Sequence, residues 1–353
     1  MTETVRINIS RPYDVIIGSG ILDSCGEYLY DLLWGKRLAV VTDDIVAGLY
    51  LERVMKSLES SGFRVFSVVF PHGEGSKNMG VLADILEKLA EGGLTRADAV
   101  VALGGGVTGD MAGFAASVYQ RGIPFAQIPT TLLAAVDSSV GGKTAVDLAA
   151  GKNLAGVFAQ PVRVICDTDT FNTLPPEVFA DGCAESIKYG VLTDPELFES
   201  FSRLDKSRLP ELVARCVRIK GDYVERDEFD TGDRRFLNLG HTMGHAIEKL
   251  SSYTFPHGHA VGVGMVMIAR AGEKLGLTEA GTAEAIAAAL ENNDLPVSSP
   301  YSPEELYSAA IGDKKRMGGK ITVVIPEKIG SCSLKTMPVN ELLELARLGK
   351  EGV

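Results

Sequence analysis

Several features that define common protein classes are scarce or absent in this sequence of 353 residues. It has one tryptophan, five scattered cysteines without a C-x-x-C pair, and no apolar run long enough to span a bilayer. The odd number and spacing of the cysteines argue against a disulfide framework and predict free, buried thiols in a reducing compartment. Residues 1–14 lack the basic and apolar regions of a secretion signal, so we expect a cytoplasmic protein.

An excess of positive charge is also missing. The chain has 35 Lys and Arg against 46 Asp and Glu, which gives a formal net charge of −11. This balance argues against general attraction to nucleic acid or to an anionic membrane, and we expect neither as a partner. An anionic small molecule must therefore be bound by a local cluster of Lys and Arg.

The alternation of strand and helix patterns ends near residue 173. Before this point, short strand-like runs alternate with helical runs and predict a mostly parallel, Rossmann-like α/β sheet covered by helices. Beyond it, helical periodicity dominates, and only KITVVIP reads as a strand, expected in a lone hairpin or at an edge. We predict an α/β domain over residues 1–173 and a mainly α-helical domain over residues 174–353.

Four of the five histidines fall within residues 234–263. His241 and His245 are four residues apart in a helical run, a spacing that offers two ring nitrogens to one metal ion. His257 follows a proline-containing break and opens a second helical run, two residues before His259. A carboxylate from elsewhere would complete a three-ligand site with an open position. The alternatives are half-buried histidines at helix ends, or a general base without metal.

A glycine-rich turn, GGGVTGD, follows the strand AVVAL and opens a helix. Gly104, Gly106 and Gly109 satisfy the G-x-G-x-x-G pattern, in which bare backbone approaches a pyrophosphate at a helix N-terminus. The acid usually found about twenty residues later is absent, which leaves Asp43 or Glu74 to hold ribose hydroxyls. A tight turn without a ligand is the alternative.

Cationic residues stand beside glycines in the segment VDSSVGGKTAVDLAAGKN. Lys143 and Lys152 combine here with flexible backbone amides, which suits a phosphate or another anion. The GGKT string lacks the upstream glycine of a P-loop, so this segment does not indicate ATP binding. Thr130 and Thr131 end the preceding strand at the carboxyl edge, where open α/β sheets bind ligands.

Further charged residues lie in the helical half. Glu185 and Lys188 stand three apart on a helix, as either a surface ion pair or a metal ligand with an adjacent cation. Lys220, Arg234 and the run at residues 313–316 add positive charge, although such groups are usually solvated.

Five segments together resemble the 3-dehydroquinate synthase family, a branch of the sugar phosphate cyclases. They are GGGVTGDMAGFAAS, YQRGIPFAQIPTTLLAAVDSSVGGKTAV, GKNLAGVFAQP, LPPEVFADGCAESIKYG and RRFLNLGHTMGHAIE. The motifs cover residues 71–314 in the family's order. The resemblance implies an NAD-binding, Rossmann-like N-terminal domain, a mainly helical C-terminal domain, and NAD+ and Zn2+ (or Co2+) as cofactors.

The resemblance also implies roles for single residues. The metal ligands match Glu185, His241 and His257, whereas His245 matches a position that contacts the substrate phosphate. The positions implied to bind NAD+ are Asp43, His72, Gly73, Glu74, Gly75, Ser76, Lys77, Gly106, Val107, Thr108, Gly109, Asp110, Thr130, Thr131, Lys143, Lys152, Thr170, Phe171, Asn172 and Thr173. The positions implied to act on the substrate are Arg121, Asp137, Lys143, Lys152, Asn153, Lys188, Lys220, Arg234, Asn238, His245 and one of Lys314 and Lys315.

The implied activity is that of a carbon–oxygen lyase acting on a sugar phosphate in the shikimate pathway of aromatic amino acid biosynthesis. It converts 3-deoxy-D-arabino-heptulosonate 7-phosphate to 3-dehydroquinate and phosphate through transient oxidation by NAD+, phosphate elimination, reduction and aldol closure. Two rival hypotheses are a sibling cyclase acting on glucose 6-phosphate or sedoheptulose 7-phosphate, and an alcohol or glycerol-phosphate dehydrogenase that releases NADH.

Two further expectations follow from the resemblance. Arg121, in YQRG, matches an arginine that family members extend across a dimer interface, which implies a homodimer. The family commonly reads H-G-E-A-V after the second metal histidine, whereas this chain has His259 in place of the glutamate. We expect His259 to lie outside the metal ligand set.

Overall fold

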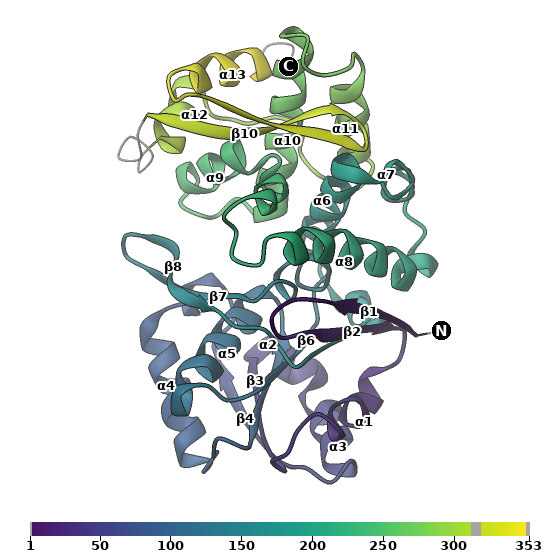
Figure 1. Cartoon of the computed structure of the whole chain (residues 1–353), viewed down its shortest axis with the longest axis vertical. Coiled ribbons are helices and arrows are strands. Elements are labelled where there is room, and N and C mark those ends of the chain that lie inside the picture. Colours follow the sequence, from purple (N-terminus) through teal and green to yellow (C-terminus); the bar gives the residue numbers. More distant parts are fainter. Residues whose placement is uncertain (1, 312–318, 351–353) are drawn as a thin grey trace. The chain divides into compact units, whose positions relative to one another are not determined.

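The computed structural model describes residues 2–311 and 319–350 (Figure 1). The expected substrate residues Lys314 and Lys315 lie outside these ranges. The chain divides into two compact units, Met1–Leu174 with Leu209–Glu225, and Pro175–Arg208 with Arg226–Val353. The predicted second domain comprises all of residues 174–353, whereas in the structure Leu209–Glu225 groups with the first unit.

A seven-stranded sheet in the order β1-β2-β9-β6-β5-β3-β4 forms the centre of the first unit. β1 pairs with β2 in antiparallel register, and the other neighbours pair in parallel. The strands are β1 (Glu3–Ile7), β2 (Tyr13–Gly18), β3 (Arg37–Asp43), β4 (Arg64–Phe70), β5 (Ala99–Gly104), β6 (Phe125–Pro129) and β9 (Arg163–Asp167). Every residue of β5 and β6 is buried, as expected for central parallel strands covered on both faces. The predicted Rossmann-like α/β fold is confirmed.

Helices cover both faces of this sheet because successive strand residues point to opposite sides. Val40 and Val101 pack in one apolar cluster with residues of α1 and α3, and Val41 and Val100 pack in another with residues of α4 and α5. The helices of this unit are α1 (Cys25–Tyr30), α2 (Asp44–Val46), α3 (Glu52–Ser60), α4 (Met79–Glu91), α5 (Gly106–Val118) and α8 (Leu209–Arg226).

A separate antiparallel hairpin is formed by β7 (Lys143–Leu148) and β8 (Gly151–Phe158). The sequence analysis assigned no strand to this glycine- and lysine-rich segment. Most of β8 is exposed, so its residues lack the alternation of apolar and polar side chains by which a half-buried strand is identified.

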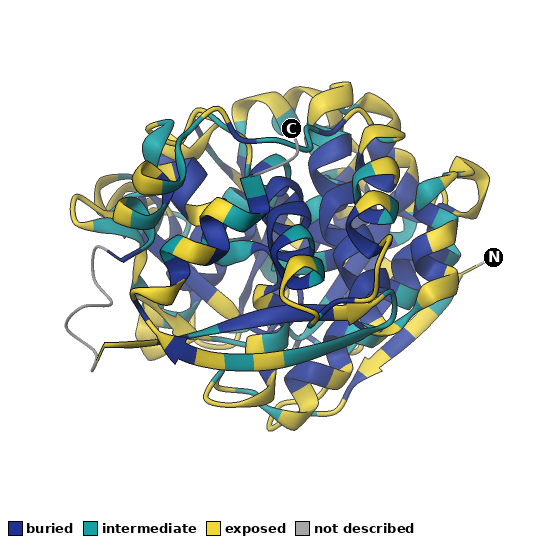
Figure 2. Cartoon of the chain, turned by 90° about the horizontal axis from the view of Figure 1, so that it is seen from above, coloured by how far each residue is buried: buried dark blue, intermediate teal, exposed yellow. Residues whose placement is uncertain are grey.

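Helices dominate the second unit, which confirms the mainly helical prediction. They are α6 (Pro176–Thr193), α7 (Pro195–Ser202), α9 (His241–Leu250), α10 (His257–Lys274), α11 (Thr282–Glu291), α12 (Pro303–Ala310) and α13 (Glu341–Lys350). The predicted C-terminal strand is β10 (Lys320–Lys328), paired with β11 (Ser331–Pro338) in a two-stranded hairpin. Buried residues fill the interior helices, while exposed ones concentrate on outer elements and turns (Figure 2). None of the described helices has both the length and the apolar character needed to cross a bilayer.

Helices α9 and α10 approach each other closely where two glycines meet. A Cβ atom on Gly264 would lie 2.0 Å from the carbonyl oxygen of Gly240. Gly240 itself has a φ of +79°, a conformation that side chains disfavour, and it immediately precedes the first residue of α9. Glycine at both positions therefore sets the spacing between the two helices that begin with His241 and His257.

We expect Gly264→Ala to lower the free energy of unfolding by about 1–3 kcal/mol, because the added methyl group must push backbone apart. Gly48→Ala is the matched control, since nothing lies within 4 Å of its added Cβ and the change should be neutral or slightly stabilising. Chemical denaturation of both variants measures the difference. Equal stability of the two variants would contradict the proposed packing constraint.

Candidate active site

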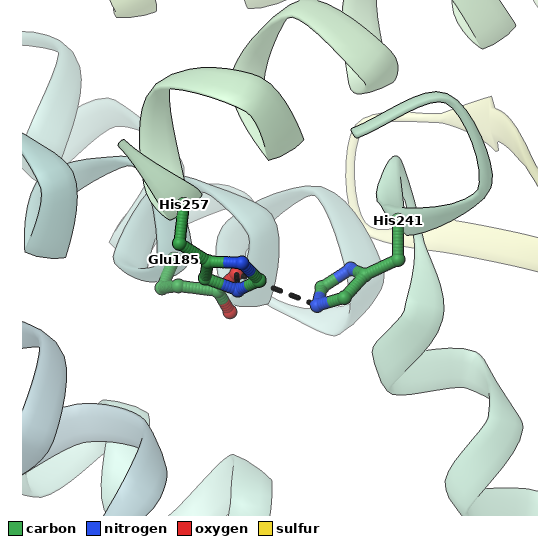
Figure 3. A group of neighbouring side chains, drawn as sticks. All are labelled: Glu185, His241 and His257. Atoms are coloured by element: carbon green, nitrogen blue, oxygen red, sulfur yellow. Dashed lines mark ion pairs between the residues drawn. The ribbon is translucent and has the colours of Figure 1, made fainter. Parts of the chain in front are cut away.

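Three potential metal ligands come together in the second unit from three different helices. Glu185 lies within α6, and His241 and His257 are the first residues of α9 and α10. The Nε2 atoms of His241 and His257 lie 3.8 and 3.7 Å from Oε1 of Glu185. The three side chains point toward one another (Figure 3), and their ligand atoms lie within 4.8 Å of each other.

The Glu185 carboxylate is fully buried, and among the described residues its oxygens have no uncharged hydrogen-bond donor. Lys188, one turn further along α6 and 1% exposed, forms an ion pair with it. The alternative of a surface ion pair is therefore wrong for these residues. A buried carboxylate without hydrogen-bond donors is costly unless cations compensate its charge. This environment fits a divalent ion held together with the two imidazoles.

Both histidine rings are held through Nδ1, which leaves Nε2 directed toward Glu185. The His241 Nδ1 lies 3.1 Å from the backbone oxygen of Leu239, and the His257 Nδ1 lies 3.3 Å from Oε2 of Glu248. Oxygen partners of this kind fix the orientation of metal-binding histidines. Sequence reasoning missed Glu248, which is buried on α9 in an otherwise unremarkable helical run.

The two histidines have opposite pKa shifts. Burial lowers the pKa of His257, but the hydrogen bond to Glu248 and the nearby carboxylates outweigh burial and raise the value to about 9. Burial, followed by the charges of Lys188, His257 and His245, holds the pKa of His241 well below its usual range. In the protein without metal, His241 is therefore neutral near pH 7, whereas His257 carries a proton.

His245 and His259 lie beside this cluster in different ways. The exposed His245 ring is centred 5.2 Å from the His241 ring and 6.0 Å from the His257 ring. His245, Glu248 and His257 also lie within ligand distance of one another. His259 instead contacts Asp181 through both its backbone nitrogen and Nδ1.

Arg234 is held in a buried position by a folded loop. Its side chain donates from Nη1 to the backbone oxygen of Glu228 at 3.0 Å, and the residue is 3% exposed. The Asp227 carboxylate accepts hydrogen bonds from the backbone nitrogens of Thr231, Gly232 and Arg234. These bonds outweigh desolvation and lower the pKa of Asp227 to about 2. Asp227, which the sequence analysis missed, thus fixes the backbone that carries Arg234.

Arg234 lies in a 3-10 helix, Asp233–Asn238, which precedes α9 and ends with the exposed Asn238.

In the first unit, lysines expected to bind ligands are paired with acids. The buried Lys220 on α8 lies 2.7 Å from Oδ1 of Asp137, and Lys152 lies 3.3 Å from Oε1 of Glu74. Asn153 follows on the β7–β8 hairpin with a φ of +56°. Lys143 opens the same hairpin and is exposed.

The glycine-rich turn joins β5 to α5, as the motif predicted. Asp43, at the end of β3, caps α2 and accepts a hydrogen bond from Thr108 at 3.2 Å, which places it beside the turn. Lys77 lies 2.6 Å from Asp110 in α5. Burial raises the pKa of Asp110 to about 6 despite this ion pair.

Buried hydroxyl groups lie near the same turn. Within residues 2–311 and 319–350, no hydrogen-bond partner is found for Thr130 Oγ1 or for the Oγ atoms of Ser138 and Ser139. Ser138 Oγ is 3.1 Å from the position a Cβ would take on Gly106. Thr131 Oγ1 accepts from the backbone nitrogen of Ala134. The two serines were not among the expected site residues, because serine in a loop carries little signal by itself.

The remaining expected cofactor residues occupy two short segments of the first unit. His72 contacts Asp44 through both its backbone nitrogen and Nδ1. The 3-10 helix Thr168–Thr173 is held by Tyr50, whose hydroxyl donates to the backbone oxygen of Thr170 at 3.1 Å.

Arg121 follows the end of α5 that is distant from the glycine-rich turn. Because α5 has 13 residues, its two ends are separated by about 20 Å. Arg121 is exposed and has a φ of +67°. Its side chain therefore cannot reach the glycine-rich turn of its own unit.

Comparisons with known proteins agree with the motifs. Models of the 3-dehydroquinate synthase N-terminal and C-terminal regions match residues 67–181 and 182–316. The chain belongs to the 3-dehydroquinate synthase family. The 3-dehydroquinate synthase of Streptococcus suis is 43% identical over 347 residues, which cover 96% of this chain and 98% of the relative. That of Enterococcus faecalis is 43% identical over 358 residues, with 99% of both chains covered.

Solved structures of related cyclases have the same fold. A 2-deoxy-scyllo-inosose synthase complexed with carbaglucose-6-phosphate, NAD+ and Co2+ has a TM-score of 0.88 and 25% identity, over 98% of this chain and 99% of that chain. A 2-epi-5-epi-valiolone synthase from Streptomyces hygroscopicus, with NAD+ and Zn2+ bound, has a TM-score of 0.86 and 26% identity, over 95% of this chain and 96% of that chain. The two-domain fold expected from the family resemblance is thereby confirmed.

Because His257 holds its proton up to a pKa of about 9, a divalent ion must displace that proton. The affinity for Zn2+ should therefore rise by up to about tenfold per pH unit from neutral pH and level off near pH 9. Competition with a chromophoric chelator at several pH values measures this slope. Glu248→Gln should shift the dependence to lower pH, since it removes the carboxylate that stabilises the imidazolium. Zn2+ affinity that does not change between pH 7 and 9 would contradict the assignment.

Proposed function

We propose that this chain is a 3-dehydroquinate synthase, which converts 3-deoxy-D-arabino-heptulosonate 7-phosphate to 3-dehydroquinate and phosphate. Curated relatives of that name are similar over nearly the full length of the chain. The structural observation that supports the proposal is the buried Glu185 carboxylate, which is paired with Lys188 and faces the Nε2 atoms of two oriented histidines. Burying these ionisable groups in a helical core is costly, so an arrangement of this kind is not expected from packing alone.

We infer that the cofactors are NAD+ and one divalent ion, Zn2+ or Co2+. The two related cyclases named above contain NAD+ with Co2+ or Zn2+. In this chain Glu185, His241 and His257 would hold the metal. When bound, NAD+ accepts and returns a hydride, and the metal polarises the oxygen at the oxidised carbon.

The glycine-rich turn and its surroundings would bind NAD+. Bare backbone at the N-terminus of α5 suits a pyrophosphate. Asp43 beside the turn offers a carboxylate for ribose hydroxyls. Buried hydroxyls that have no partner among the described residues, such as that of Thr130, supply further polar groups. The remaining NAD+ positions implied by the family lie in residues 72–77, 106–110 and 170–173, with Thr131, Lys143 and Lys152.

The substrate carries a phosphate and a carboxylate, and both need cationic partners. Lys188 places an ammonium beside Glu185, next to the proposed metal position. Arg234 has a guanidinium that can meet a carboxylate with two parallel hydrogen bonds. His245 presents an exposed ring next to the metal ligands. The other proposed substrate residues are Arg121, Asp137, Lys152, Asn153, Lys220 and Asn238, with Lys314 or Lys315.

The reaction itself gives the most direct test. With the heptulosonate phosphate, Zn2+ and a catalytic amount of NAD+, phosphate should accumulate in excess of NAD+ while net NADH stays near zero. A chelator should abolish turnover and added Zn2+ should restore it. NADH formed in proportion to product would instead favour a dehydrogenase. Equal rates with glucose 6-phosphate or sedoheptulose 7-phosphate would favour a sibling cyclase.

We expect Arg234→Ala to lower kcat/KM by roughly two to four powers of ten, because breaking a buried charge-assisted pair costs about 2–5 kcal/mol. Arg235→Ala is the matched control, since it removes the same charge from an exposed neighbour. Steady-state kinetics of both variants, with Zn2+ affinity measured in parallel, separate a substrate contact from general damage. Similar kcat/KM values for the two variants would mean that Arg234 does not bind substrate.

We infer that the protein works in the reducing cytoplasm, because its five cysteines are free.

We infer that the active form is a homodimer in which Arg121 serves the partner's site. Chains with Arg121→Ala and chains with Lys188→Ala should each be nearly inactive. Equal mixing with subunit exchange should restore about a quarter of the wild-type activity, since half the dimers would contain one intact site. No recovery despite demonstrated exchange would show that Arg121 acts within its own chain or not at all.

A further inference from the structure

The helix that begins with His257 lacks a capping side chain of its own. Its N-cap residue is Pro256, which makes no side-chain capping hydrogen bond. The first backbone N–H groups of a helix have no partners within that helix and need acceptors from elsewhere. A metal ligand in the first turn is therefore only as well placed as the groups that hold this turn.

Asp181, on α6, supplies the missing acceptor. Its Oδ1 lies 2.9 Å from the backbone nitrogen of His259 and 2.9 Å from Nδ1 of the same residue. Asp181 is 9% exposed, so these bonds are largely protected from water. A single carboxylate oxygen thus holds both the backbone and the side chain of the third residue of α10.

Asp181 also lies where α6 and α10 are in close contact. A Cβ atom on Gly258 would lie 2.1 Å from the backbone oxygen of Asp181, so the start of α10 rests directly on α6. Asp181 stands four residues, about one helical turn, before Glu185 on α6. The bond between Asp181 and His259 therefore connects the turn that carries Glu185 to the turn that carries His257.

We propose that Asp181 is a positioning residue for the metal centre. It holds the first turn of α10 against α6, through the backbone and side chain of His259, and so sets the distance between His257 Nε2 and Glu185. Glu248 orients the His257 ring, whereas Asp181 locates the backbone from which that ring projects. The inference rests on the proposed metal site.

Zn2+ affinity, measured by chelator competition, is the property that tests this role. Removing a partner that supports a metal ligand typically weakens affinity by about 10–100-fold, and we expect this loss for Asp181→Ala. Asp181→Asn keeps an oxygen acceptor at Oδ1 and should stay within about threefold of the wild type. Thermal unfolding of the metal-free proteins is recorded in parallel.

Ser302→Ala is the matched control for loss of a helix cap. Ser302 caps α12 in the same unit, in a reciprocal capping box with Glu305. This variant should unfold at a lower temperature but bind Zn2+ like the wild type. If Asp181→Ala lowers the unfolding temperature while its Zn2+ affinity stays within about twofold of the wild type, Asp181 is only a helix cap and the inference is overturned.

A double variant separates capping from positioning, and it also serves if Asp181→Ala alone fails to fold. Pro256→Ser combined with Asp181→Ala gives α10 a local capping side chain without the connection to α6. We expect this protein to regain thermal stability but to retain the weakened Zn2+ affinity. Recovery of wild-type affinity would overturn the inference.

His241→Ala provides the reference without a complete ligand set and should bind Zn2+ poorly. If the wild type binds Zn2+ no better than His241→Ala, the proposed metal site fails, and the inference fails with it. If the wild type binds one equivalent tightly and Asp181→Ala binds it equally well, only the inference fails.

Discussion

The burial of the Glu185 carboxylate is the main constraint on how α6, α9 and α10 are arranged in the second unit. Glu185 is fully buried, and its oxygens have no uncharged hydrogen-bond donor in the described part of the chain, so positive charge must compensate it. The ammonium of Lys188 and the protonated ring of His257 provide such charge in the protein without metal. Three helices have to converge for this to happen, which explains why α9 and α10 both begin at the site. The carboxylate that would hold a divalent ion thus lies beside cationic groups of the protein itself.

Close helix packing is the means by which the ligands converge. Gly264 lets α10 approach the backbone at Gly240, and Gly258 lets the start of α10 rest on α6 at Asp181. A methyl group at either glycine would meet a backbone oxygen at about 2 Å, which neither helix can accommodate without moving. The placement of the ligand side chains therefore depends on the short distances between the backbone of α10 and the backbones at Gly240 and Asp181. The histidines converge because these glycines permit close packing of α10 against the start of α9 and against α6, which carries Glu185.

Periodicity and local motifs predicted the parallel sheet, the helical second half and the turn at Gly106. Spacing also drew attention to His241 and His257, but it favoured His245 equally, and only the family resemblance separated them. Glu248, Asp181 and Asp227 could not be found in this way. Asp181 acts on a residue 78 positions further along the chain, and single acids such as Glu248 and Asp227 have no distinctive spacing in a helix or loop. The exposed β8 strand was missed for a related reason, because exposed residues carry no hydrophobic pattern.

The net charge of −11 required any anion site to be local, and the lysines proposed for such sites lie close to acids. Lys220, Lys152 and Lys77 lie beside Asp137, Glu74 and Asp110 respectively. A simple anion that binds one of these ammonium groups must compete with the carboxylate already beside it, which opposes binding. A ligand with both anionic oxygens and hydroxyl groups can satisfy the ammonium and the carboxylate together. Such paired groups therefore favour polyhydroxylated anions over inorganic anions of the same charge.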